Sequence, residues 1–300
     1  MLRASNLIRS LLFAYSPTNE DYVQSLYWYL GIIRPISEAI LHDSTHAYRP
    51  NRGIDSEIEE FRKAVIVQPG GRPVTVAQED IVECFDNAPI ALVLNYLPPF
   101  TRKQVTILLQ RYRETVRVRD RYPHGGPQGH PATCALVNMT IDHLLAPIRK
   151  DYTGRAFIIT YSDDLTIIGD SITVLEVTQA IRRAFARHGL QLNQLKSRRT
   201  PIIPGSKIVL LGYEFEWGYD INKAPIIRPK RGAYENLSDK IGSADTHFRI
   251  RTVIQGWKAC YGWTNDPEHA SRTKQAIDEG LRRHSFTPTA TASPSLRGNP

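Results

Sequence analysis

The sequence predicts an α+β fold in which a mainly antiparallel sheet carries helices on one side. Short β-rich runs are interspersed with longer segments of helical periodicity, and the two runs within 156–169 form a hairpin pattern. With 300 residues, of which 41% are hydrophobic, the chain is long enough to bury a large core. We therefore expect a globular protein of one to three domains.

The segment before residue 66 is predicted to be helical. An amphipathic helix opens the chain, although Arg3 and Arg9 without a nearby acid would also suit an organelle transit peptide. A second helix is expected over Asn19–Leu41 and a charged helix over Asp55–Val65, separated by a turn-rich stretch. The apolar face of the second helix, expected to pack in the core, consists of Tyr22, Leu26, Leu30, Ile33, Ile36 and Ile40.

The middle of the chain is predicted to mix strands and helices. Strand-forming residues run from Val74 towards Asp80, and residues 88–116 have helical periodicity with Thr101 as a helix N-cap. A loop rich in glycine and proline, Tyr122–Pro131, precedes an apolar helix that ends near Ile148.

Helices and strands continue after the hairpin. A helix is expected over Ile172–His188 with Gly189 as its C-cap, followed by strands at Ser206–Leu211 and Tyr213–Trp217. Helical periodicity returns from Gly232 to Arg283, and the polar residues 286–300 are expected to be disordered.

Positive charge is concentrated in the last part of the chain. The formal net charge is +8, and residues 181–300 hold 20 basic and 10 acidic residues, whereas residues 1–180 hold 18 and 20. Such an excess favours a polyanionic partner, although a solvated surface is the alternative. Basic residues alternate with aromatic residues there, which suits binding to a nucleic-acid backbone.

The three cysteines, Cys84, Cys134 and Cys260, match neither a disulfide framework nor zinc-ligand spacing. We expect them to be core residues of a protein in a reducing compartment, the cytoplasm. No apolar run approaches the roughly 20 residues that cross a bilayer, so no membrane partner is expected.

Acidic residues between hydrophobic strands are the strongest chemical signal. Asp163 and Asp164 lie at the predicted hairpin tip, and Asp80 ends another strand-like run. Buried carboxylates need compensation by a cation or by hydrogen-bond donors. If the two strands are neighbours, these acids can hold two divalent cations, as phosphoryl transfer requires, although a tandem aspartate alone is usually a turn feature.

Several motifs in a fixed order resemble those of reverse transcriptases. Tyr161-Ser162-Asp163-Asp164 resembles the Tyr-x-Asp-Asp motif, and Asp80-Ile81-Val82-Glu83-Cys84-Phe85-Asp86 resembles the first palm motif. The further matching elements are Ala47–Gly53 (a Phe-Arg-Pro-x-Arg-like element), Gly126–Pro131 (the Pro-Gln-Gly loop), Leu192–Lys196 (Leu-Asn-x-x-Lys), Leu210–Tyr213 (the Leu-Gly-Tyr primer grip) and Gln255–Tyr261 (a thumb Gly-Trp-x-x-Tyr stretch).

The resemblance covers Tyr22 to Trp263 and is closest to prokaryotic group II intron, retron and defence-associated enzymes. It implies a right-hand polymerase fold with reduced fingers, an antiparallel palm and a helical thumb. The expected domains are fingers and the start of the palm (1–79), palm (80–217, with a finger-like helical insertion at about 88–121), thumb (218–285) and a disordered tail (286–300).

The resemblance also implies a role for each matching residue. Two Mg²⁺ ions, with Mn²⁺ as a substitute, would bind at Asp80, Ile81, Asp163 and Asp164, and Lys196 would reach the departing pyrophosphate. Incoming dNTPs would bind at Phe85, Gln128, Gly129 and Tyr161, and the Phe85 ring would exclude a 2′-hydroxyl. Template or primer would contact Arg49, Arg52, Leu211, Gly212 and Tyr213.

Three functions agree with these motifs. The first is an RNA-directed DNA polymerase that binds an RNA template and a DNA primer and copies a dedicated noncoding RNA in phage defence or a retron-like system. An RNA-dependent RNA polymerase is the second, and a non-catalytic RNA-binding scaffold the third. A shorter fingers sequence than relatives carry leaves the triphosphate contacts unassigned, and the departure His130-Pro131 from the usual Ser-Pro pair leaves the details of template contact open. Oligomerisation is left open.

Overall fold

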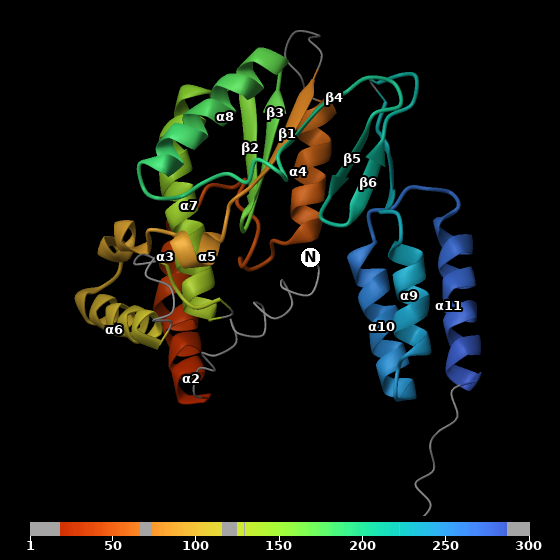
Figure 1. The fold of residues 1–300 in the computed structure, drawn as a ribbon, viewed down its shortest axis with the longest axis horizontal. Coiled ribbons are helices and arrows are strands. Elements are labelled where there is room, and N and C mark those ends of the chain that lie inside the picture. Colours follow the sequence, from red (N-terminus) through yellow and green to blue (C-terminus); the bar gives the residue numbers. More distant parts are fainter. Residues whose placement is uncertain (1–18, 67–73, 116–124, 129, 222, 287–300) are drawn as a thin grey trace, which may run out of the picture. The chain divides into compact units, whose positions relative to one another are not determined.

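The computed structural model describes residues 19–66, 74–115, 125–128, 130–221 and 223–286. The predicted first helix, with Arg3 and Arg9, and the polar tail from residue 287 lie outside the described residues. The chain forms two compact units, residues 1–206 and 207–300, and each is described by itself below (Figure 1).

The helical segment predicted over Asn19–Leu41 is confirmed in its limits, but it is not one continuous α-helix. It consists of α2 (Asn19–Trp28), a π-helical turn η1 (Tyr29–Ile33) and α3 (Arg34–Ile40). Pro35 in the first turn of α3 has no N–H to donate, which interrupts the regular helical hydrogen bonds at this point.

The apolar face predicted for this segment is wrong at three positions. Tyr22, Leu30 and Ile40 are 44%, 49% and 40% exposed, whereas Ile33 is fully buried. The π turn adds a residue to one turn, so side chains with regular spacing before and after it no longer share one face. The predicted helix at Asp55–Val65 is confirmed as α4 (Ile54–Ile66).

The first unit contains a four-stranded antiparallel sheet in the order β2-β3-β1-β4. The predicted hairpin is confirmed as β2 (Ala156–Tyr161) and β3 (Asp164–Gly169), and the predicted strand before it as β1 (Thr75–Asp80). Strand β4 (Arg198–Pro201), which was not predicted, pairs with β1 at the edge of the sheet.

Long helices cover this sheet, and the remaining helical segments lie between β1 and the hairpin. Helices α7 (Pro131–Asp151) and α8 (Ser171–Ala186) supply much of the core against Leu165 and Ile167 of β3. The connection between β1 and α7 contains α5 (Cys84–Asn87), the 3-10 turns Ile90–Leu92 and Leu94–Tyr96, and α6 (Pro99–Thr115). Thr101 is not the N-cap, because α6 already begins at Pro99, which suits a first helical turn.

The expectation that helices cover only one side of the sheet is wrong. Successive strand residues point to opposite faces. Arg182 of α8 lies 3.7 Å from the Glu79 carboxylate, whereas the Glu57 carboxylate of α4 interacts with Asp164, the neighbour across the sheet of Asp80. Helices α8 and α4 therefore cover opposite faces.

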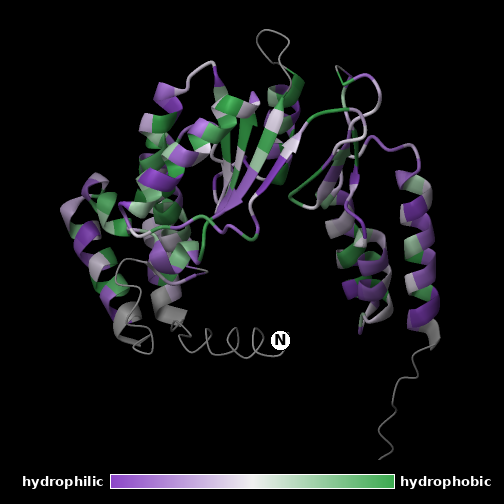
Figure 2. Ribbon diagram, turned by 45° about the horizontal axis from the view of Figure 1, so that its top comes forward, coloured by the Kyte–Doolittle hydropathy of each residue, from purple (hydrophilic) through white to green (hydrophobic). Residues whose placement is uncertain are grey.

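In its described residues, the second unit combines a small sheet with three helices. Strands β5 (Lys207–Leu210), β6 (Tyr213–Glu216) and β7 (Ile226–Pro229) form an antiparallel sheet, of which β7 was not predicted. The helices are α9 (Ala233–Gly242), α10 (His247–Cys260) and α11 (His269–Phe286). Helix α11 is largely hydrophilic (Figure 2), and its Gly280 lets it approach Ile241 of α9 closely, since a Cβ there would lie 2.7 Å from the Ile241 side chain.

Two of the three cysteines are core residues, as predicted. Cys84 and Cys134 are buried, but Cys260 at the end of α10 is exposed, so the prediction is wrong for Cys260. In the part of the chain that the structure describes, no helix is both long and apolar enough to span a bilayer.

Candidate active site

Three side chains of the predicted site form a row across the palm sheet. Asp164 at the start of β3 lies directly opposite Asp80 at the end of β1 and opposite Tyr161 at the end of β2. Directly opposed residues of antiparallel strands project to the same face of the sheet. The strands therefore bring Asp80, Asp164 and Tyr161 together at one end, although Asp80 and Asp164 are far apart in the sequence.

The third carboxylate, Asp163, is placed by the hairpin turn. Ser162 has φ 58°, a left-handed conformation that reverses the chain in two residues. The Asp163 carbonyl then accepts a hydrogen bond of 3.0 Å from the Ile81 amide, which fixes the turn against the end of β1. Ile81 itself is buried, with 1% of the residue exposed, so any contribution to a metal would come from its backbone.

The acids at this end of the sheet repel each other. Desolvation, together with the carboxylates of Asp163 and Asp80, raises the pKa of Asp164 to about 6, although part of the residue remains exposed. Carboxylates that destabilise each other's ionised forms are relieved by a divalent cation.

Carboxylate oxygens are the ligands that hard cations prefer, so the chemistry of Asp80, Asp163 and Asp164 fits Mg²⁺. Their side chains are not positioned as a complete ligand set, since among the described residues no group of three or more His, Cys, Asp or Glu could hold a metal ion as it stands.

Lys196 lies at the site, where it balances the charge of Asp80. Its ammonium donates a hydrogen bond of 2.6 Å to the Asp80 carboxylate, and this contact is the main cause that raises the pKa of Lys196. Asn193 anchors the same turn, because its amide donates to the Asp80 carbonyl at 2.7 Å and its side chain contacts the Asp80 carboxylate at 3.4 Å. The Leu-Asn-x-x-Lys element is thus tied directly to the first palm motif.

The predicted nucleotide-binding residues Phe85 and Gln128 lie on two segments that contact each other. The Gly126 amide donates a hydrogen bond of 2.9 Å to the Phe85 carbonyl. A Cβ on Gly125 would lie 2.0 Å from the Asp86 carbonyl oxygen, so this glycine permits its backbone to approach the backbone of Asp86 closely. Gln128 is exposed, and Gly129 lies outside the described residues.

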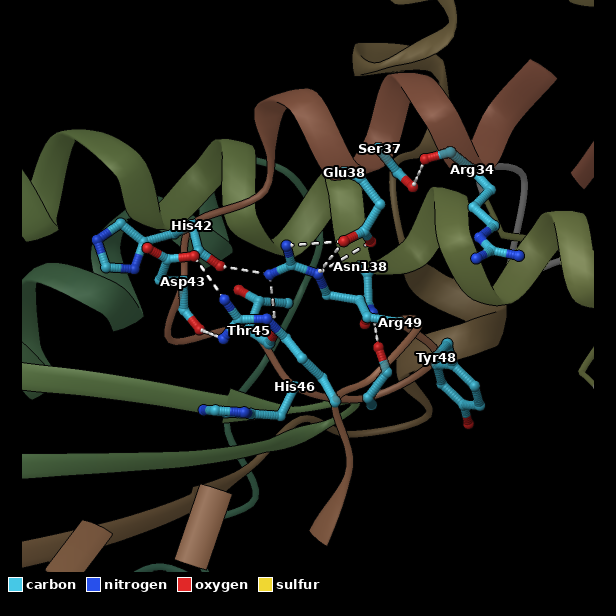
Figure 3. Close-up of polar contacts among 12 residues, drawn as sticks. Arg34, Ser37, Glu38, His42, Asp43, Thr45, His46, Tyr48, Arg49 and Asn138 are labelled. Atoms are coloured by element: carbon cyan, nitrogen blue, oxygen red, sulfur yellow. Dashed lines mark hydrogen bonds and ion pairs between the residues drawn. The ribbon is translucent and has the colours of Figure 1, made fainter. Parts of the chain in front are cut away.

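Arg49 has a structural role in this structure. Its guanidinium donates to both oxygens of Glu38 and to the carbonyls of His42 and Thr45, at 2.8–3.3 Å (Figure 3). Only 4% of its side chain is exposed. These contacts indicate that Arg49 stabilises the fold as an ion-paired residue, and they do not support its predicted contact with template phosphates. Arg52 pairs with Asp43 at 2.6 Å but keeps 26% of its side chain exposed.

The predicted primer-grip residues Leu211, Gly212 and Tyr213 lie in the second unit, at the turn between β5 and β6. Leu211 and Gly212 both have positive φ, 47° and 89°. Tyr213 is fully buried, and its hydroxyl donates a hydrogen bond of 2.5 Å to the Cys260 carbonyl. Tyr213 therefore packs in its own unit, and the contact of this turn with a primer stays a prediction.

Two residues near the carboxylates were missed by the sequence analysis. Glu57 of α4 is 1% exposed, neither of its carboxylate oxygens has a hydrogen-bond partner among the described residues, and it interacts with Asp164. Tyr48 contacts the Phe85 ring. No local pattern distinguishes Glu57 from the other acids of a charged amphipathic helix. Tyr48 belongs to the motif Ala47–Gly53, of which only the arginines were predicted to be functional.

An antiparallel palm with acids from two neighbouring strands at one end defines the fold of the right-hand polymerases. The family model described as reverse transcriptase (RNA-dependent DNA polymerase) matches residues 13–215, and the chain belongs to this family. The predicted fold class is thereby confirmed. A search of curated proteins found no match.

Telomerases are among the solved structures that resemble the chain. Apo telomerase from Candida tropicalis has a TM-score of 0.50 and 11% identity, with 88% of this chain and 51% of that chain covered. Its form truncated from the C-terminal domain has a TM-score of 0.46 and 10% identity, with 73% of this chain and 50% of that chain covered. Telomerase from Candida albicans with a fragment of telomeric RNA has a TM-score of 0.44 and 8% identity, with 84% of this chain and 50% of that chain covered. The chain spans about half the length of these structures, and the likeness concerns the fold alone.

Proposed function

We propose that the chain is an RNA-directed DNA polymerase that extends a DNA primer along an RNA template by two-metal nucleotidyl transfer. The row of Asp80 and Asp164 across neighbouring strands, with Asp163 in the adjoining turn, carries the proposal. Mg²⁺ bound there would lower the pKa of the primer 3′-hydroxyl and neutralise charge on the departing pyrophosphate.

The residues of the chain have separate tasks in this proposal. Asp80, Asp163 and Asp164 hold the metal ions, with the backbone of Ile81 beside them. Lys196, which pairs with Asp80 at 2.6 Å, is within reach of the same space and donates a proton or a charge-assisted hydrogen bond to the leaving group.

Primer extension in Mg²⁺ tests the proposal. The wild-type protein should extend a DNA primer on an RNA template, and Asp163→Asn should lose the activity by at least about a hundredfold, because a carboxylate that holds the metal is removed. Asp151→Asn, at an exposed position at the end of α7, is the matched control and should retain activity. An inactive wild type, with template, primer and both metals supplied, would leave the non-catalytic scaffold as the better explanation.

Phe85 separates DNA synthesis from RNA synthesis. The residue is 8% exposed, and its backbone carbonyl accepts a hydrogen bond from the Gly126 amide, in the loop that bears Gln128. If the ring excludes a 2′-hydroxyl, Phe85→Val should increase incorporation of ribonucleotides relative to deoxynucleotides. A wild-type enzyme that prefers ribonucleotides would favour the RNA-dependent RNA polymerase.

The biological setting that we propose is a prokaryotic, cytoplasmic enzyme of the retron-like or defence-associated type, which copies a dedicated noncoding RNA. It rests on the motif resemblance alone. Sequencing of RNA that co-purifies with the protein should find one enriched species, and a random RNA sample would contradict a dedicated template.

A further inference from the structure

Tyr48 combines a left-handed backbone conformation with an exposed side chain. It lies in the segment between α3 and α4 with φ 56°, in the left-handed region that tyrosine rarely adopts. Its neighbours Ala47 and Arg49 are buried, but Tyr48 itself is 46% exposed. Such a conformation persists only where the surrounding structure enforces it, and it is typical of functional sites.

Three helices enforce this conformation from both sides of Tyr48. Asn138 of α7 hydrogen-bonds to the Ala47 carbonyl, and the Tyr29 hydroxyl donates to the Tyr48 carbonyl at 3.1 Å. Arg49 is locked by the Glu38 carboxylate of α3. Figure 3 shows the Tyr48 ring projecting away from this polar network. The fixed backbone thus presents the ring outwards in one direction.

The Tyr48 side chain lies beside residues of two predicted motifs. The centroid of its ring lies 6.2 Å from the centroid of the Phe85 ring, with an interplanar angle of 86°, an edge-to-face contact. Burial raises the pKa of the Tyr48 hydroxyl, and its interaction with the side chain of Ser162, which precedes Asp163 in the hairpin turn, opposes this rise. Tyr48 therefore links the ring proposed to select the sugar with the turn that carries the carboxylates.

Left-handed backbone recurs in the segments next to Tyr48. Ser162 has φ 58°, and Glu83, two residues before Phe85, has φ 44°. Of the five residues other than glycine with positive φ among those described, three therefore belong to the segments that carry Tyr48, Phe85 and Ser162. Strain concentrated at one place indicates that its geometry matters for function more than for stability.

We propose that Tyr48 is a specificity-determining residue that holds the Phe85 ring in place against the sugar of an incoming deoxynucleoside triphosphate. Without the Tyr48 ring, the Phe85 ring can turn into the vacated space, and a 2′-hydroxyl then fits. The inference rests on the proposed polymerase function and adds a second residue to its selection of the sugar.

The test compares single-nucleotide incorporation of dATP and ATP by full-length variants. Tyr48→Gly and Tyr48→Asn both remove the ring at a positive φ that glycine and asparagine tolerate, so both should fold. Each should lower the ratio of kcat/KM for dATP over ATP by about tenfold or more, mainly through a lower KM for ATP. Tyr48→Phe keeps the ring and should retain the ratio.

Tyr96→Ala is the matched control. Tyr96 is also 46% exposed and makes an edge contact of 6.2 Å with a ring, that of His143, outside the proposed site. Its ratio should stay unchanged. An unchanged ratio in Tyr48→Gly and Tyr48→Asn, while Phe85→Val loses discrimination, would overturn the role of Tyr48 and leave the polymerase intact. Absence of wild-type activity would instead overturn the proposed function.

Discussion

At the scale of single residues, the buried acid Glu57 should make stability depend on pH. It lies on α4, and neither carboxylate oxygen has a hydrogen-bond partner within the described parts of the chain. Desolvation, together with the nearby carboxylates of Asp164 and Glu60, raises its pKa to about 8. Glu57 is therefore protonated at neutral pH in the folded, metal-free protein, whereas it is ionised in the unfolded chain.

This difference makes folding stability depend on pH. Between pH 4.5 and about 8, Glu57 binds a proton in the folded state that it has lost in the unfolded state, so its contribution to the free energy of unfolding falls as pH rises through this window, by up to about 1.4 kcal/mol per unit. Glu57→Gln has no proton to lose and should remove this part of the decline. Urea unfolding at pH 5, 6, 7 and 8 in metal-free buffer measures it.

Glu59→Gln on the same helix is the control. Glu59 is exposed and its pKa is lowered by Lys63, so its titration lies below the window and the wild-type decline should persist. Parallel curves for the wild type and Glu57→Gln would show that Glu57 is ionised in the folded protein.

At the scale of elements, α8 depends on its N-cap. The Asp170 carboxylate accepts hydrogen bonds of 3.1 Å from the amides of Ile172 and Thr173 and one of 2.7 Å from the Thr173 hydroxyl. Negative charge at a helix N-terminus also interacts favourably with the helix dipole.

Asp170→Ala should lower the free energy of unfolding by about 1–2 kcal/mol, because two helix amides lose their acceptor. Asp170→Asn keeps an acceptor oxygen and should recover most of the loss. Chemical denaturation of the three proteins gives the values, and equal stability of the alanine and asparagine variants would contradict a capping role.

Elements with a local signal were predicted from the sequence. The hairpin 156–169 has apolar residues on both sides of a polar turn, and α4 and α8 have regular helical periodicity, so their limits agree within a few residues. Strands β4 and β7 are four residues long and exist through pairing with β1 and β6. That pairing leaves no pattern within the strands themselves.

The site was predictable where motifs mark it. Asp80, Asp163 and Lys196 belong to separate motifs, and the structure joins them through the β1–β3 register and the contact of Lys196 with Asp80. Tyr48 could not be selected in this way, because its contact with Phe85 depends on a backbone held by α3 and α7. Motifs identify chemical groups, whereas such contacts arise only in the fold.

At the scale of the whole molecule, the excess of positive charge should govern the binding of nucleic acid by the proposed polymerase. Helix α10 exposes three basic residues, Arg249, Arg251 and Lys258, none of which has an ion-pair partner within the described residues. We expect them to contact backbone phosphates of the primer–template duplex, with release of counterions.

Replacement of all three by glutamine should weaken binding and reduce the salt dependence. Each lost phosphate contact lowers the slope of log K against log salt by about 0.9, so a change of about 2–3 is expected. Fluorescence anisotropy titrations at several salt concentrations between about 50 and 200 mM measure this slope. Lys103→Gln with Lys150→Gln, at exposed positions of the first unit, should leave the slope unchanged.

The three cysteines differ in solvent exposure, which allows selective labelling of one of them. Burial together with the carboxylates of Asp163 and Asp80 raises the pKa of the Cys84 thiol, and Cys134 is also enclosed, whereas Cys260 is open to solvent. Because thiolates react with maleimides, a dye should couple at Cys260 alone in the native protein. The unaltered chain thus carries a single attachment point for a fluorophore at the end of α10, through which movements of the second unit can be followed in real time.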